Sequence, residues 1–318
     1  MNRAFLLLPA WNRCLGSINV ARGVLSQWCA RGDALSTQSF GFDVALRELI
    51  PWHGKSLPSA ALSRQVDFSD ASGSAWLRAD PAHVRADMAT ARMLACGDVG
   101  LAPDECAQIE KDLKPLFGDA GFEFDARLQN RWYLRAPMGS ELPLCASPDE
   151  AIGDDLKLHL PQGASGKRWR QLFNESQIIL HNHPVNQRRA ARGAVSVNSL
   201  WFWGAGVLPD WARSSSIKRI ASDSMEIGGL AALANIPVRP LTSENIGEML
   251  LEPNDGDVLI DLSELRGDPL ETCLGSVDRA MRQRRVGSVE LVFVSGERFR
   301  YRAFNRFRFW RRVGELAR

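Results

Sequence analysis

Histidine and tyrosine are scarce in this sequence, with five and two copies among 318 residues. The six cysteines are scattered without a Cys-x-x-Cys pair, which argues against a zinc site or a disulfide framework and for reduced thiols. No apolar run approaches the roughly 18 residues that a membrane span needs. The apolar segment Ala4–Trp11 contains a proline and no small-residue cleavage site, so it does not predict a signal peptide. We therefore expect a soluble, cytoplasmic protein without a membrane partner.

Neither sign of charge dominates. The 39 lysines and arginines nearly balance the 37 aspartates and glutamates, so the net charge of +2 says little about partners. Basic residues nevertheless concentrate between Lys167 and Arg192 and again after Arg279. A content of 45% hydrophobic and 24% charged residues is that of an ordinary globular protein. The length is sufficient for one large domain or two smaller ones.

Strand and helix patterns alternate on both sides of a segment with a different texture. Residues 257–262 predict a buried parallel strand, and 289–302 predict a β-hairpin. Gly54–Ser74 is rich in Ser, Pro and Gly and predicts a linker, whereas 75–160 predicts a small α+β unit. Ser165 is the predicted cap of a long amphipathic helix. The expected fold class is α/β: a three-layer core assembled from residues 1–60 and 165–318, with 75–160 as an inserted smaller α+β domain.

Polar groups are densest in the segment Leu180–Gly193, which is followed by Asn198 and the strand end Trp201-Phe-Trp-Gly-Ala-Gly206. Such density is typical of places where a turn and a ligand are both satisfied. The amino-acid sequence of this segment resembles the His-Pro-Val-Asn … Trp-x-Trp-Gly-x-Gly motif of archaeal-type cofactor-independent phosphoglycerate mutases. More narrowly, the chain resembles the bacterial family called regulatory protein RpfE. The resemblance implies that the predicted core is of the alkaline-phosphatase-like type.

The catalytic parts of that superfamily do not carry over. Its chemistry uses two divalent metals, held by Asp and His clusters, and a Ser or Thr nucleophile at a helix N-terminus. The first strand continues into Pro9-Ala-Trp-Asn12 where the mutases have a metal-binding acid, and Ile260–Asp268 holds acids but no histidine. We therefore expect a catalytically degenerate, regulatory or interaction protein that uses no cofactor and has a protein partner. The alternative is an active phosphoglycerate mutase or phosphatase, with Mn²⁺ or Mg²⁺ on noncanonical ligands: Asp257, Asp261, Glu264 and Asp268.

Two groups of basic residues predict an anion-binding cleft. Guanidinium groups suit phosphate and carboxylate, and cations in the first turn of a helix call for a compensating anion. The expected ligand is a small phosphorylated or carboxylated molecule. A solvated basic face is the alternative for the arginines, and a turn or helix end is the favoured role for His181 and His183 over a metal site. The predicted ligand-binding residues are Lys167, Arg168, Arg170, His183, Asn186, Arg188, Arg189, Arg192 and Asn198.

The tail Arg298–Arg312 interleaves seven arginines with six aromatic residues. This pattern fits single-stranded nucleic acid, through stacking and charge. It equally fits an edge hairpin whose aromatic face packs inward while its arginines face solvent. The second interpretation is favoured, so nucleic-acid association is the least favoured of the three functions considered.

Overall fold

The computed structural model describes residues 2–17, 23–37, 39–87, 90–214, 216–252 and 256–311. The chain divides into two compact units. Unit 1 consists of residues 1–55 and 209–318, and unit 2 of residues 56–208. The chain therefore leaves unit 1 once, builds unit 2, and returns.

Unit 1 is built on a mixed sheet. Within the described residues this sheet has seven strands, in the order β2-β12-β11-β1-β10-β8-β9. The strands from β11 to β9 are parallel, and the β11–β12 hairpin and β2 add an antiparallel edge. The elements are β1 (Arg3–Leu8), α1 (Trp11–Ser17), α2 (Val24–Arg31), β2 (Asp33–Ala34), α3 (Phe42–Leu49), β8 (Ile217–Ala221), α9 (Met225–Leu233), β9 (Val238–Arg239), α10 (Ser243–Leu251), β10 (Asp257–Asp261), α11 (Gly267–Arg282), β11 (Ser288–Phe293), β12 (Arg298–Arg302) and the 3-10 turn η2 (Ala303–Phe307).

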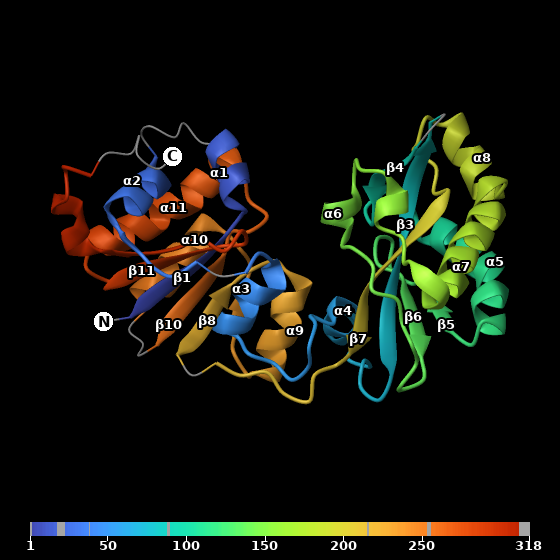
Figure 1. The fold of residues 1–318 in the computed structure, drawn as a ribbon, viewed down its shortest axis with the longest axis horizontal. Helices are drawn as coiled ribbons and strands as arrows, with labels where there is room; N and C mark the ends of the chain where they lie inside the picture. The colour runs from blue at the N-terminus through green and yellow to red at the C-terminus, as the bar shows by residue number, and fades with distance from the viewer. Residues whose placement is uncertain are drawn as a thin grey trace. The chain divides into compact units, whose positions relative to one another are not determined.

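Helices cover both faces of this sheet, because its central strands are apolar on both sides. Ala4, Leu6 and Leu8 of β1 pack in one cluster with residues of α1, α2, α10 and α11. Phe5 and Leu7 are also buried, and they point to the opposite face because side chains alternate along a strand. Figure 1 shows α3 and α9 on that other side. The predicted three-layer α/β core is confirmed.

Unit 2 is a sheet whose longest helices cover one face, while shorter helices lie against the other (Figure 1). Its described strands follow the order β4-β3-β6-β5, and β7 pairs with β3. The long strand β3 alternates: Leu77 and Ala79 enter the main apolar cluster, and Arg78 and Asp80 lie on the face where Ser63 of α4 contacts Arg78. The elements are α4 (Ser59–Phe68), β3 (Ala75–Ala86), β4 (Ala91–Cys96), α5 (Pro103–Asp119), β5 (Glu123–Asp125), β6 (Tyr133–Ala136), α6 (Pro148–Ala151), the 3-10 turn η1 (Leu156–Leu158), α7 (Gly163–His181), α8 (Pro184–Ala191) and β7 (Ser199–Val207).

The inserted unit is larger than the predicted 75–160, and the difference has a clear cause. β7 pairs antiparallel with β3 from Ser199↔Ala82 to Val207↔Ala75, so α7, α8 and β7 fold with unit 2 and not with the core. The segment interpreted as a linker contains α4, which also belongs to unit 2. The long helix begins at Gly163 with Gln162 as its N-cap, two residues before the predicted cap.

Candidate functional site

The segment with the densest polar residues forms the turn between α7 and β7. His183 is the N-cap of α8, and its Nδ1 accepts a hydrogen bond from the backbone N–H of Val185 at 3.2 Å. Its Nε2 lies 3.1 Å from a carboxylate oxygen of Asp112 on α5. The ring is almost fully buried. Its Nδ1 is used within the turn, while its Nε2 faces the Asp112 carboxylate without making a hydrogen bond. This is the turn role favoured from the sequence.

Both predicted asparagine ligands fasten backbone to backbone. The amide nitrogen of Asn186 donates to the carbonyls of Leu180 (2.8 Å) and Val197 (2.7 Å), and its oxygen accepts from the N–H of Val197 (2.8 Å). Asn198 forms the equivalent pair with the N–H and carbonyl of Val84, at 2.8 and 2.7 Å. Buried amides satisfied in this way hold the loop in one conformation.

Arg189 is the most committed of the predicted anion-binding residues. Its side chain is 1% exposed. Its guanidinium donates to the carbonyls of Val195 (2.7 Å), Gly100 (2.9 Å) and Val99 (2.5 Å), and to Glu105 Oε2 (2.9 Å). Four of the five N–H donors of the guanidinium are therefore used within the protein.

Glu105 is the centre of this arrangement. Its carboxylate accepts from the N–H of Ala102 at the start of α5 (3.0 Å), from Arg189, and from Arg192 (2.8 Å). Burial acts to raise the pKa of Glu105, but the Ala102 N–H and the arginines outweigh it and the pKa is lowered. One carboxylate therefore caps α5 and anchors α8 against it.

The other basic residues do not converge on one point. Arg188 donates to Gln108 (2.5 Å), Arg168 to the carbonyl of Ala120, and Arg170 to the carbonyl of Pro161. Lys167 is exposed. The first basic group lies at the start of α7, and the second follows the end of the same helix. The part of α7 between Lys167 and its last residue, His181, is about 21 Å long, at 1.5 Å per residue. A small ligand does not span that length, so these positions do not support the single cleft predicted between Lys167–Arg170 and Arg188–Arg192, which stays a prediction.

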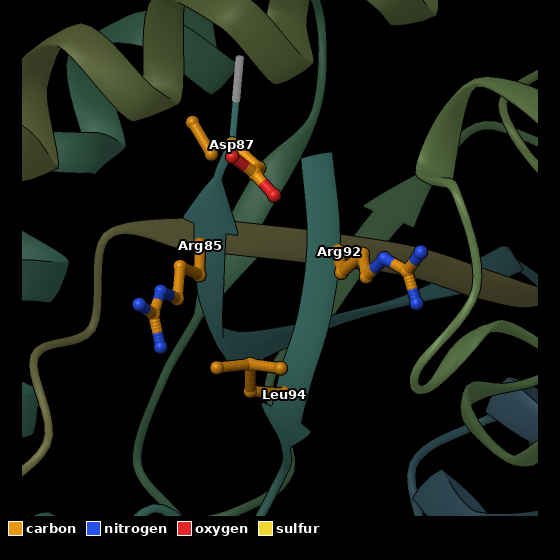
Figure 2. Close-up of a pocket in the computed structure, with 5 residues that line it drawn as sticks. Arg85, Asp87, Arg92 and Leu94 are labelled. Atoms are coloured by element: carbon orange, nitrogen blue, oxygen red, sulfur yellow. The ribbon is translucent and has the colours of Figure 1, made fainter. Parts of the chain in front are cut away.

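A pocket of about 300 Å³ lies at the tips of β3 and β4, lined by Arg85, Ala86, Asp87, Arg92 and Leu94. Figure 2 shows the side chains of Arg85 and Arg92 pointing away from each other, on opposite sides. The neighbouring Met88 and Ala89 lie outside the described residues. Because its two cations diverge, this pocket does not form an anion site.

At the carboxyl edge of the unit 1 sheet, where α/β proteins bind ligands, the position after β1 is aromatic. The ring centre of Trp11 lies 4.9 Å from that of Phe293 and 5.6 Å from that of Phe299. The backbone N–H of Trp11 donates to Ser295 Oγ (2.7 Å). Trp11 also packs against the apolar cluster of this face. The place where the resemblance requires a metal-binding acid is thus filled by apolar rings.

Asp261 ends β10 at the same edge, and its oxygens are already occupied. They accept from Ser222 Oγ (2.8 Å), Ser263 Oγ (2.6 Å) and Ser263 N–H (3.2 Å). Burial raises the pKa of Asp261, against the effect of these hydrogen bonds. This carboxyl is thus held by donors of the protein itself, and within the described residues it belongs to no group of three potential metal ligands.

The alternative ligand set for a metal is not assembled. Asp257 begins β10, about 13 Å from Asp261 at the other end of the strand, and pairs with Arg3 at 2.7 Å. Glu264 and Asp268 follow β10, in the loop and in the first turn of α11. In the part of the chain that the structure describes, no three His, Cys, Asp or Glu side chains are grouped so as to hold a metal ion.

Ser59 is a polar residue that the sequence interpretation missed. It is the first residue of α4, it is 7% exposed, and the preceding Pro58 provides no side-chain cap for the helix N-terminus. Gly204, with φ +67°, packs so closely that an added Cβ would lie 2.9 Å from Ser59 Cβ. The detectable signal was Pro-Ser at the start of a helical run.

No protein-family model matches the chain. Over 197 residues it is 26% identical to a probable 2,3-bisphosphoglycerate-independent phosphoglycerate mutase of Geobacter sulfurreducens, covering 62% of this chain and 48% of that protein. A mutase of Methanosarcina barkeri is 25% identical over 199 residues, covering 61% and 46%. That of Methanosarcina mazei is 35% identical over 65 residues, covering 20% and 16%. The chain thus spans about half the length, or less, of these relatives.

Among solved structures, the cofactor-independent phosphoglycerate mutase from Thermoplasma acidophilum is 18% identical with a TM-score of 0.44, covering 95% of this chain and 90% of that one. A protein from Pyrococcus horikoshii is 12% identical with a TM-score of 0.49, covering 95% and 87%. The sequence matches confirm the predicted similarity to cofactor-independent phosphoglycerate mutases. The narrower RpfE-like assignment stays a prediction. No described helix combines the length and apolarity that crossing a membrane requires.

Proposed function

We propose that this protein is a phosphoglycerate-mutase-like protein that does not perform metal-dependent phosphotransfer and acts as a regulatory or interaction protein. The observation that carries the proposal is the state of Asp261, whose carboxyl is buried and accepts three hydrogen bonds from Ser222 and Ser263. The aromatic contacts of Trp11 at the end of β1 support it. A chain of this kind keeps the fold of an enzyme and uses its surface to bind a protein partner.

The test is a mutase assay on the full chain with Mn²⁺, run beside a metal-free control. We expect no turnover of phosphoglycerate above that control, and less than one bound divalent ion per chain by elemental analysis. The matched variant is Asp261→Asn, which keeps the size of the side chain and an acceptor for the serines. Mn²⁺-dependent turnover that disappears in Asp261→Asn would contradict the proposal.

A second candidate, phosphotransfer through a serine, is favoured by Ser59 alone. Its position at the N-terminus of a ten-residue helix is where backbone N–H groups and the helix dipole favour a phosphate. Incubation with phosphoglycerate, followed by mass spectrometry of the peptide, would detect a phosphate ester on Ser59. Ser63 of the same peptide is the internal control, since it lies one turn further along α4. We expect no phosphate on either serine, and a stoichiometric ester on Ser59 would make this candidate the first.

A further inference from the structure

The segment after β12 exposes its aromatic residues. In the hairpin itself Tyr301 is buried and Phe299 packs against the core cluster, as the structural interpretation of the tail requires. Beyond it, the side chains of Phe304, Phe307, Phe309 and Trp310 are 54, 61, 78 and 65% exposed. A group of large exposed apolar side chains in one short segment is uncommon in monomeric proteins and indicates a binding surface. We call residues 302–311 the tail segment.

The backbone of the tail segment is fastened to the end of α2. Asn305 is fully buried and donates to the carbonyl of Arg31 (2.9 Å), and its oxygen accepts from the N–H of Arg302 (2.9 Å). Arg308 donates to Asp33 (2.5 Å), and Arg311 to the carbonyl of Gly32 (2.8 Å). These contacts satisfy carbonyls at the C-terminal end of α2, where cations are favourable. The rings take no part in them, so the segment is held in place while its rings face solvent.

Two of the four exposed rings, Phe304 and Phe307, have a guanidinium beside them. Arg302 and Arg308 lie 5.9 and 5.8 Å from the ring of Phe304, and Arg306 lies 4.7 Å from that of Phe307. Phe309 and Trp310 contact each other edge to face at 5.4 Å. Positive charge and flat apolar surface therefore alternate along the segment, as in proteins that bind single-stranded nucleic acid.

The surroundings add more positive charge. Arg302 pairs with Ser288 at the start of β11, which places the end of α11 and its loop next to the tail segment. Among the described contacts of the arginines in this region, the carboxylates are Asp33, which binds Arg302 and Arg308, and Asp278, which binds Arg282. The arginines are Arg31, Arg282, Arg284, Arg285, Arg302, Arg306, Arg308 and Arg311.

We propose that the tail segment binds single-stranded nucleic acid, with bases stacked on Phe304, Phe307, Phe309 and Trp310 and phosphates paired with the surrounding arginines. The excess of like charge calls for a polyanion, and the exposed rings call for a ligand with accessible flat faces. An unpaired strand offers both, whereas a duplex hides the faces of its bases. The exposure of these four rings disagrees with a purely structural tail, because that interpretation placed the aromatic face inside.

The test measures fluorescence anisotropy of a labelled oligothymidylate of about 15 nucleotides with the full chain. We expect a Kd that weakens about sevenfold when the salt concentration doubles, because each of about four neutralised phosphates contributes roughly −0.7 to the log–log slope. An abasic strand of equal length keeps the phosphates and removes the bases. It should bind at least about tenfold more weakly, given the usual effect of base–aromatic stacking.

The matched variants separate stacking from folding. Phe307→Ala combined with Trp310→Ala should weaken binding at least about tenfold, with an unchanged melting temperature because both rings are exposed. Phe40→Ala, at another exposed aromatic residue of unit 1, should leave binding unchanged. Equal binding of the abasic strand, or binding unaffected by the double substitution, overturns the proposal. Self-association that the double substitution abolishes, without oligonucleotide binding, also overturns it and makes the surface an interface between copies of the chain.

Discussion

Two segments of this chain, 186–192 and 302–311, have a similar density of arginines and differ in the contacts that those arginines make. In the first, Arg189 is buried and four of the five N–H donors of its guanidinium meet a carbonyl or Glu105. In the second, exposed rings lie beside Arg306 and its neighbours while the backbone is held by Asn305. The partners of the arginines, rather than the density of arginines, therefore decide the role of each segment. Acceptors from distant parts of the chain made the first segment structural.

The largest expected effect comes from removing the buried arginine. Arg189→Ala removes one of the three partners of Glu105 and the donor to three carbonyls, and breaking a buried pair of this kind costs about 3–5 kcal/mol of unfolding free energy. Arg306→Ala should change that free energy by less than about 0.5 kcal/mol. Urea unfolding followed by tryptophan fluorescence measures both. Similar losses in the two variants would remove the contrast between the segments.

Substitutions of two glycines that follow the first segment, Gly204 and Gly193, should give an intermediate effect on the unfolding free energy. Gly204→Ala adds a Cβ at 2.9 Å from Ser59 and 3.1 Å from the nitrogen of Ala60, in a left-handed conformation with φ +67°. We expect a loss of about 2–3 kcal/mol, from backbone strain and steric displacement of α4. The control is Gly193→Ala, which has φ +72° and open space around it, so that only the backbone strain of about 1 kcal/mol applies. A loss in Gly204→Ala no larger than in Gly193→Ala would show that β7 does not press on α4.

The smallest expected effect is on the pH dependence of stability, through the carboxylates that bind the arginines of the two segments, Glu105 and Asp33. The pKa of Glu105 is lowered although burial opposes the change, and the pKa of Asp33 is lowered chiefly by its hydrogen bond to Arg308. A lowered pKa adds stability that is present above the unfolded value, near 4.5 for Glu and 3.8 for Asp, and is lost as the pH falls through the folded value.

Glu105→Gln should therefore destabilise the protein at pH 7 and flatten the decline of unfolding free energy below about pH 4.5. Asp33 is about one third exposed, so Asp33→Asn should cost at most about 1 kcal/mol. Melting temperatures measured from pH 7 down to the acid transition compare the two. An acid profile that is unchanged in Glu105→Gln would contradict the role given to Glu105.

The strands with local patterns could be predicted from the sequence. The apolar runs of β1 and β10 and the hairpin β11–β12 have periodicities that do not depend on the rest of the chain. The limits of unit 2 could not, because β7 pairs with β3 across more than a hundred residues. α4 was missed because its small residues resemble a linker, and only the close approach of Gly204 to Ser59 and Ala60 shows why they are small.

The candidate site was harder to predict for the same physical reason. Asn186 and Asn198 are residue types used for both ligands and backbone bridges, and only the positions of Leu180, Val197 and Val84 distinguish the roles. The partner of Arg189 is 84 positions away in the sequence. The missing acid after β1, by contrast, was visible directly, because it depends on one short segment.

One matched pair of exposed arginines, one from each segment, distinguishes the structural role from the binding role. Arg188→Gln and Arg306→Gln each remove one exposed charge, and the Kd for the labelled oligothymidylate is measured for both at low salt. We expect Arg306→Gln to weaken binding about three- to fivefold, since losing one phosphate contact removes a favourable term, and Arg188→Gln to leave the Kd unchanged. Weakening by Arg188→Gln with no effect of Arg306→Gln would contradict the account and return anion binding to the first segment.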